Sequence, residues 1–431
     1  METRAVILPC LVSVVAGHGP GEDLWPALRA VFKENRADLD KACEAALSGP
    51  IRFNLEASDG NAMLLPHLTA VTSLAKLLST RAVVELHDNH RDAAWTNLMA
   101  VTRLVTAWDP EPVDFSQMVR YDCTATAYNL TWLALQAEGW GEERLAGLQR
   151  EWEAVDLLKR LPETAAFSGA SMVALCRAER KEPFHLQGIA MKDVILSPRF
   201  VWHTLADSWR RFRYRHRGTY EDERALMVYH QERELQLRRA TQSADWIEMR
   251  QLPGVTNVVF FASKYPSAMQ CVYNSKQLAL AWRGIQSGGR LGCPYLGQAA
   301  EAEARRRLMV CAIALERYRD KHGSYPPDLL ALVPELLPSP PLDFMNGEPL
   351  CYRLGRNGHF VLHSVGLDCV DNGGKLPSGG LSMRITSDTD LVWPRPGSEA
   401  EVERFHQEEV EAYSKLAARP EGTDPTTYEE K

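Results

Sequence analysis

With 431 residues, the chain is long enough for two or three domains, each with its own buried interior, and too long for a small scaffold held by disulfides. Its 49 basic and 56 acidic residues give a net charge of −7, so the overall charge offers no attraction to nucleic acid or anionic lipid. Nine cysteines are dispersed without a CxxC pair, which argues against a zinc knuckle or a disulfide framework.

The N-terminal segment, residues 1–50, contains the longest apolar run of the chain, residues 5–16. This run is shorter than the roughly 20 residues that a membrane-spanning helix needs, so we expect no transmembrane segment. It follows Arg4 and ends in small residues before Gly17, a pattern similar to a weak secretory signal. The alternative is a buried strand or helix, and in both cases we expect a helix to follow within the segment.

The helical body, residues 51–290, is predicted from apolar residues that recur at three- and four-residue steps. One such stripe runs over residues 64–86 and a second over residues 94–108, with a short polar break between them. So short a connection makes the two helices antiparallel neighbours. Similar stripes at residues 118–135 and 145–155 extend the pattern. We therefore predict a mainly α fold of stacked helical hairpins, without a repeat strict enough to name.

Two polar clusters in this body have both a structural and a functional interpretation. The His-Asp-Asn-His sequence at residues 87–90 could in principle bind a metal, but its central Asp and Asn favour a turn. The basic run at residues 210–217 resembles sites that bind polyanions or lipid head groups. Aromatic residues within it repeat at helical spacing, and acidic residues follow at 221–223, so a helix with solvated arginines is the favoured interpretation.

The C-terminal module, residues 298–396, begins with a charged helix over residues 298–321. We expect this helix to be exposed, with apolar residues on one side only. Gly323 ends the helix, and two prolines soon after it prevent its continuation. Strands at residues 350–354 and 359–364, joined by a Gly-Arg-Asn-Gly turn, are predicted to form a small antiparallel hairpin.

Four motifs occur in a fixed order in this module: residues 318–326, which end in Gly-Ser-Tyr-Pro, Pro-Leu-Asp at 341–343, Tyr-Arg at 352–353 and Ser-Val-Gly-Leu-Asp at 364–368. In this order they resemble the soluble part of the major pseudopilin of type II secretion systems. The chain as a whole resembles uncharacterised bacterial proteins in which a helical body precedes such a module. The resemblance implies a pilin-like helix plus a small antiparallel sheet. It also implies a location in the cell envelope or outside the cytoplasm, with a cytoplasmic location as the alternative.

The resemblance further implies a calcium site in the acidic loop after the second strand. Carried over residue by residue, it assigns as ligands the carbonyl of Val365 and the carboxylates of Asp368, Asp388 and Asp390. Asp371 is a further oxygen donor within reach. Calcium prefers roughly six to eight oxygen ligands, and a glycine-rich loop can bring carboxylates and carbonyls together. The alternative is a simple turn with solvated acids.

The segments on either side of the module differ from a pseudopilin. No counterpart of its hydrophobic leader helix occurs ahead of residue 299, so we do not expect assembly into a conventional pseudopilus. Beyond the module, the composition of residues 397–431 predicts a charged helix followed by a disordered tail.

The expected function is that of a non-enzymatic binding or scaffold protein of the envelope, with a calcium-stabilised module and a protein partner that the sequence does not identify. No HExxH, GxSxG, P-loop or GxGxxG motif occurs. Two alternatives stay open. One is a hydrolase with a site in a groove of the helical body, using His67, His87 or His230. The other is a cytoplasmic partner or polyanion-binding protein that uses residues 210–217.

Overall fold

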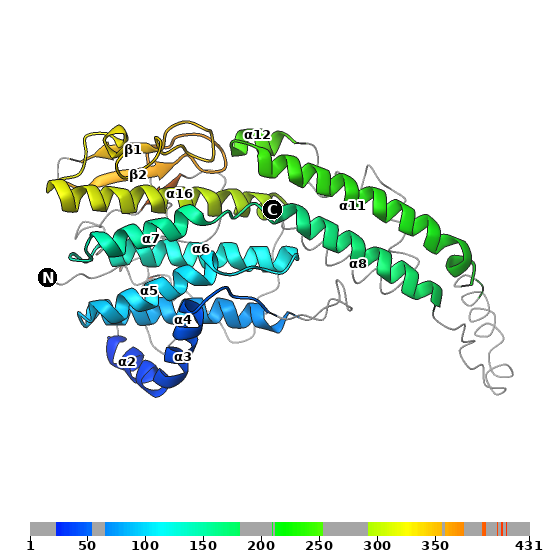
Figure 1. Ribbon diagram of the computed structural model, residues 1–431, viewed down its shortest axis with the longest axis horizontal. Coiled ribbons are helices and arrows are strands. Elements are labelled where there is room, and N and C mark those ends of the chain that lie inside the picture. The colour runs from blue at the N-terminus through cyan, green and yellow to red at the C-terminus, as the bar shows by residue number, and fades with distance from the viewer. Residues whose placement is uncertain are drawn as a thin grey trace.

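The computed structural model describes residues 23–53, 65–181, 212–252, 292–355, 358–374 and 390–393, together with the single positions 209, 403, 407 and 411. Helices dominate this part of the chain, and a small antiparallel sheet lies in its C-terminal region (Figure 1). The predicted fold class, mainly α with a C-terminal α+β module, is therefore confirmed. None of the described helices is long and apolar enough to cross a membrane. The signal-like run and most of the predicted tail lie outside the described residues.

The helices of the N-terminal segment and of the first part of the helical body form one stack (Figure 1). They are α2 (Trp25–Glu34), α3 (Arg36–Leu47), α4 (Pro66–His87), α5 (Arg91–Thr106), α6 (Asp114–Leu135) and α7 (Glu142–Ala154). The chain turns between α4 and α5 at residues 87–90, as predicted. Asn89 adopts a left-handed φ of 61° there, a conformation that asparagine tolerates, and the N–H of His90 donates to the carbonyl of Glu85 over 2.7 Å.

Helix α6 packs against α4, α5 and α16 (Gly292–His322) and is buried around most of its circumference. Polar residues are buried together with the apolar ones. The hydroxyls of Thr124 and Thr131 donate to the carbonyls of Arg120 and Ala127, over 2.9 and 2.7 Å. Because these hydroxyls find their acceptors within the same helix, α6 can lie in the interior without unpaired hydroxyl groups at these two positions.

Helix α16 differs from the sequence-based expectation, because it is buried rather than exposed. It lies between α7 and the sheet (Figure 1), and it contacts α6, α7, β2 and β3. Several of its charges pair within the helix: the guanidinium groups of Arg306 and Arg307 lie 2.7 and 2.9 Å from a carboxylate oxygen of Glu303. These pairs offset the cost of burying Glu303, which a simple count of charged residues does not reveal. The core is therefore continuous from the helical body into the C-terminal module.

The sheet has three antiparallel strands in the order β1 (Cys351–Leu354), β2 (Phe360–Ser364) and β3 (Leu391–Trp393). The first two form the predicted hairpin, whereas the third was not predicted. Cys351 lies directly opposite His363 across β1 and β2, and Leu362 lies opposite Trp393 across β2 and β3. Leu362 and Trp393 are buried and contribute to the continuous core.

A long helical arm extends from the body (Figure 1). It consists of α8 (Leu161–Lys181), the π-helical turn η2 (Tyr214–Gly218) and α11 (Thr219–Gln242). Helices α8 and α11 lie side by side, and Gly169 permits their close approach, since a Cβ there would lie 2.8 Å from the Cβ of His230. Helix α12 (Trp246–Gln251) then joins the arm to the module. Its Trp246 indole donates to the carbonyl of Leu367 over 3.1 Å.

Residues 212–217 of the basic run lie at the far end of the arm, and residues 210 and 211 fall outside the described part (Figure 1). The rings of Trp209 and Phe212 stack with their centroids 5.6 Å apart, and those of Phe212 and His216 lie 4.3 Å apart, in agreement with the helical spacing of the aromatic residues. Arg217 pairs with Glu221 at 2.9 Å. An acidic neighbour thus neutralises at least this arginine, as expected.

Candidate metal site in the C-terminal module

The acidic loop, residues 365–374, follows β2 and folds back against it. Gly374 has a left-handed φ of 68°. A Cβ at this position would lie 2.9 Å from Nδ1 of His363 and 3.0 Å from Cγ1 of Val361. Glycine therefore allows the loop backbone to approach β2 more closely than any other residue could. This approach brings the carboxylates of the loop to the side chains of the sheet.

Asp343 anchors the start of the loop. Its carboxylate is buried and accepts three hydrogen bonds: from the Ser364 hydroxyl over 2.7 Å, and from the N–H groups of Val365 and Met345 over 2.9 Å each. Three donors satisfy this carboxylate. Asp343 therefore stabilises the loop, and its oxygens are already in use.

Asp390, immediately before β3, has a side chain that is 0% exposed. Its carboxylate accepts hydrogen bonds from the N–H of Asn372, 3.1 Å from each oxygen, and from the N–H of Gly374 over 2.7 Å. Among the described residues its only ion-pair contact is with His363, whose Nε2 lies 3.8 Å from Oδ2. Backbone donors thus hold both oxygens of Asp390, as they do those of Asp343. Unlike Asp343, Asp390 shares the Nε2 side of His363 with a second carboxylate, that of Asp371, and a bound cation would offset the negative charge gathered there.

His363 connects Asp390 to two further side chains. Its Nε2 lies 2.9 Å from Oδ1 of Asp371, which also accepts the N–H of Gly373 over 2.8 Å. The thiol of Cys351 lies 3.9 Å from Oδ2 of the same aspartate. The hydrogen bonds from His363 and from Gly373 lower the pKa of Asp371, whereas burial and the neighbouring carboxylates raise the pKa of Cys351 to about 11.

The sequence-predicted ligands separate into two groups. Asp371 and Asp390 come together, since both approach Nε2 of His363. Val365 and Asp368 have other contacts: the N–H of Val365 donates to Asp343, and Asp368 accepts the N–H of Val370 over 3.1 Å within its own turn. Asp388 lies outside the described residues.

The sequence analysis did not identify two side chains of the candidate site, Cys351 and His363. Both lie in the predicted hairpin, and the facing register of β1 and β2 was the signal that could have paired them.

The convergent atoms include oxygen, nitrogen and sulfur. One ligand atom each from Cys351, His363 and Asp371 lies within 4.8 Å of the other two. The carboxylates of Asp371 and Asp390 suit calcium, which prefers oxygen. Imidazole and thiol groups suit zinc and similar metals. The residues therefore fit a divalent cation, and they fit calcium only in part, because Asp368 shares no described contact with Asp371 or Asp390.

The histidines considered for a hydrolase do not form one site. His67 and His87 lie at opposite ends of α4, about 30 Å apart at the helical rise of 1.5 Å per residue. His67 has its Nε2 3.1 Å from Oε1 of Glu111, and its ring stacks on Phe53. His230 is buried in the arm, where desolvation lowers its pKa to about 3. Because His67 and His87 lie so far apart, the three histidines cannot all belong to one catalytic site.

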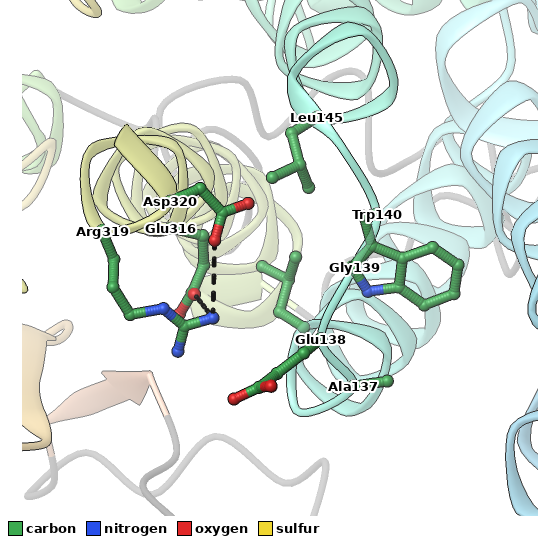
Figure 2. A pocket seen from close by; sticks show the side chains of 9 residues that line it. Ala137, Glu138, Gly139, Trp140, Leu145, Glu316, Arg319 and Asp320 are labelled. Carbon is green, nitrogen blue, oxygen red and sulfur yellow. Dashed lines mark ion pairs between the residues drawn. The ribbon is translucent and has the colours of Figure 1, made fainter. Parts of the chain in front are cut away.

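A small pocket lies between the α6–α7 turn and α16 (Figure 2). The side chain of Glu138 extends toward Arg319 (Figure 2), and Arg319 pairs with Glu316 at 2.8 Å. The hydroxyl of Tyr325, from the Gly-Ser-Tyr-Pro motif, donates to Oε1 of Glu316 over 2.6 Å. Burial raises the pKa of Glu316 to about 7, against the opposing effects of Tyr325 and Arg319. Through this hydrogen bond, the Gly-Ser-Tyr-Pro motif packs its tyrosine against the C-terminal end of α16.

The chain matches no protein-family model, no curated protein and no solved structure. The resemblance to the type II secretion pseudopilin therefore stays a prediction from the motifs.

Proposed function

We propose that the protein is a non-enzymatic binding or scaffold protein of the cell envelope, whose pseudopilin-like module is stabilised by calcium. The burial of Asp390 is the observation that most supports a bound cation. Its side chain is 0% exposed, and its only described ion-pair partner is His363. Asp371, beside the same histidine, supplies further negative charge. An ion that binds these carboxylates in the folded state alone stabilises that state by mass action.

The architecture supports the binding or scaffold role. The arm formed by α8 and α11 extends away from the helical stack (Figure 1). Four large apolar residues of α11 are exposed at seven- and eight-residue intervals: Tyr220, Met227, Val228 and Leu235. At this spacing they share one face of the helix. Exposed apolar residues gathered on one face are typical of surfaces that contact another protein.

Thermal unfolding of the full chain tests the proposal. After treatment with EDTA, calcium chloride should raise the melting temperature of the wild-type protein by several degrees. Asp390→Asn and Asp371→Asn should each reduce this response, and Asp38→Asn, an exposed carboxylate in α3, is the matched control that should respond like wild type. If neither EDTA nor calcium changes the melting temperature of the wild-type protein, calcium does not stabilise the module.

The hydrolase and polyanion-binding alternatives have separate tests. Turnover of an ester, phosphate or peptide panel that disappears in His67→Gln would favour a hydrolase. Retention on heparin that falls with salt and with replacement of Arg213 and Arg217 would favour polyanion binding. Neither result is expected for a scaffold protein.

A further inference from the structure

We propose that Cys351, His363 and Asp371 form a binding site for zinc or a similar thiophilic divalent metal ion. The inference concerns the same place as the proposed calcium site and shares Asp371 and Asp390 with it, but its other two ligands and its class of ion do not depend on the proposed function. It goes further by assigning two ligands on the sheet and by naming a different class of ion.

The strand register places the first two ligands. Cys351 on β1 and His363 on β2 are directly opposite each other in an antiparallel pair. Side chains of such a pair lie on the same face of the sheet, with Cβ atoms about 5 Å apart. Two ligands are therefore held on a rigid element, and their separation does not depend on the loop.

The loop supplies the third ligand. Asp371 has Oδ1 2.9 Å from Nε2 of His363 and Oδ2 3.9 Å from Sγ of Cys351, so one oxygen faces each partner. The N–H of Gly373 holds Oδ1 in place over 2.8 Å. The carboxylate thus lies between the imidazole and the thiol. Metal binding would displace the thiol proton of Cys351 and would require an unprotonated Nε2 on His363, whereas the Asp371 carboxylate could bind as it stands.

The histidine is oriented for this role. Its side chain is only 9% exposed, its Nδ1 is buried on the side where a Cβ at Gly374 would lie 2.9 Å away, and its Nε2 is the nitrogen directed at Asp371. The carboxylate of Asp371, by contrast, is 54% exposed. The ligand on the sheet, His363, is therefore held in place by its burial, whereas the ligand on the loop, Asp371, is open to solvent and gives an ion a route of entry.

The donor set selects the ion. Zinc takes sulfur, nitrogen and oxygen ligands in tetrahedral sites, with metal–ligand distances of about 2.0 to 2.3 Å. The three ligand atoms lie within 4.8 Å of one another, so movements of about 1 Å would bring them to tetrahedral spacing. Asp390, 3.8 Å from Nε2 of His363, is placed to be the fourth ligand, with a water molecule as the alternative. Calcium makes no use of a thiol or an imidazole.

Cobalt(II) titration of the metal-free full chain tests the assignment, because a cobalt–thiolate bond absorbs in the near ultraviolet and tetrahedral cobalt absorbs in the visible. We expect both signals to saturate at one equivalent in the wild-type protein and zinc to abolish them by displacement. Cys351→Ser should lose the thiolate signal and bind cobalt roughly tenfold or more weakly. Cys369→Ser is the matched control, since its thiol points to the Met345 carbonyl instead, and it should behave like wild type.

The outcomes separate this inference from the proposed function. Absence of the thiolate signal in the wild-type protein, or its persistence in Cys351→Ser, would overturn the thiophilic site. Displacement of cobalt by calcium as readily as by zinc would do the same. Melting that responds to calcium without a thiolate signal supports the proposed function alone. A thiolate signal with melting that is insensitive to calcium supports the zinc-type site and contradicts calcium.

Discussion

The phenol of Tyr128 in α6 donates a hydrogen bond to the carbonyl oxygen of Val392 in β3 over 2.8 Å. The ring also meets Trp393 edge to face, with centroids 5.1 Å apart. These contacts join the centre of the helical body to the last strand of the module. Together with buried α16, they make the body and the sheet parts of one continuous core.

Tyr128→Phe should keep the ring contact and lose the hydrogen bond. The Val392 carbonyl would then lose its donor in a partly buried position, so we expect the free energy of unfolding to fall by about 1 to 2 kcal/mol. Urea unfolding measures this change. Tyr220→Phe, at an exposed position on α11, is the control and should be neutral. Equal stability of the two variants would show that the contact between α6 and β3 contributes little.

Glu316 should make the protein less stable as the pH rises. Burial raises its folded-state pKa to about 7, above the usual value near 4.5. Between these two pH values the unfolded state releases a proton that the folded state retains, so the free energy of unfolding should fall by up to about 3 kcal/mol across this window. Glu316→Gln should flatten this slope in urea unfolding series from pH 4.5 to 7.5. Glu143→Gln, an exposed residue of α7, should leave the slope unchanged; an unaltered slope in Glu316→Gln would contradict the assignment.

His230 should make the protein less stable as the pH falls, the opposite of the pH dependence expected from Glu316. Desolvation, and then the charge of Arg233, lower its folded-state pKa to about 3, well below the usual value near 6.5. Between pH 6.5 and pH 3 only the unfolded state takes up a proton on His230. The free energy of unfolding is therefore unaffected by this residue above pH 6.5 and falls as the pH is lowered toward 3. His230→Gln should therefore lessen acid destabilisation between pH 6.5 and 4, whereas the exposed His90→Gln should not. Identical acid profiles for wild type and His230→Gln would show that the imidazole is not excluded from solvent.

Gly169→Ala should loosen the arm. The new Cβ would lie 2.8 Å from the Cβ of His230, so α8 and α11 would have to move apart, at a cost of about 1 to 3 kcal/mol. Gly147→Ala is the matched control in α7, where a Cβ meets only the tip of Arg150 at 3.9 Å, and it should stabilise the protein by up to about 1 kcal/mol. Chemical denaturation followed by helical circular dichroism compares the two. A stabilised Gly169→Ala would contradict the close packing of the arm.

The strictly periodic parts of the fold could be predicted from the sequence. Leu98, Val101 and Val105 recur at helical steps and are all buried, and the polar break before α5 is a turn. Helix α16 was misjudged because the charged residues that suggested exposure, such as Glu303 and Arg307, neutralise each other at 2.9 Å. Local sequence shows the charges but not their pairing.

The third strand and half of the candidate site could not be predicted for a different reason. Strand β3 spans only Leu391–Trp393, and its identity as a strand depends on pairing with a distant segment. Asp371 was predicted because an acidic residue in a glycine-rich loop is visible locally, and Asp390 because the resemblance to the pseudopilin assigned it. Cys351 and His363 become neighbours of Asp371 only after the hairpin register and the return of the loop are both set.

A crystal structure of the full chain soaked in calcium chloride would show directly whether a cation binds the acidic loop beside β2. We expect an ion bonded to carboxylate oxygens of Asp371 and Asp390, with His363 adjacent to it. Only ordinary water at this position, with both carboxylates still held by the N–H groups of Gly373, Asn372 and Gly374, would contradict calcium binding at the loop.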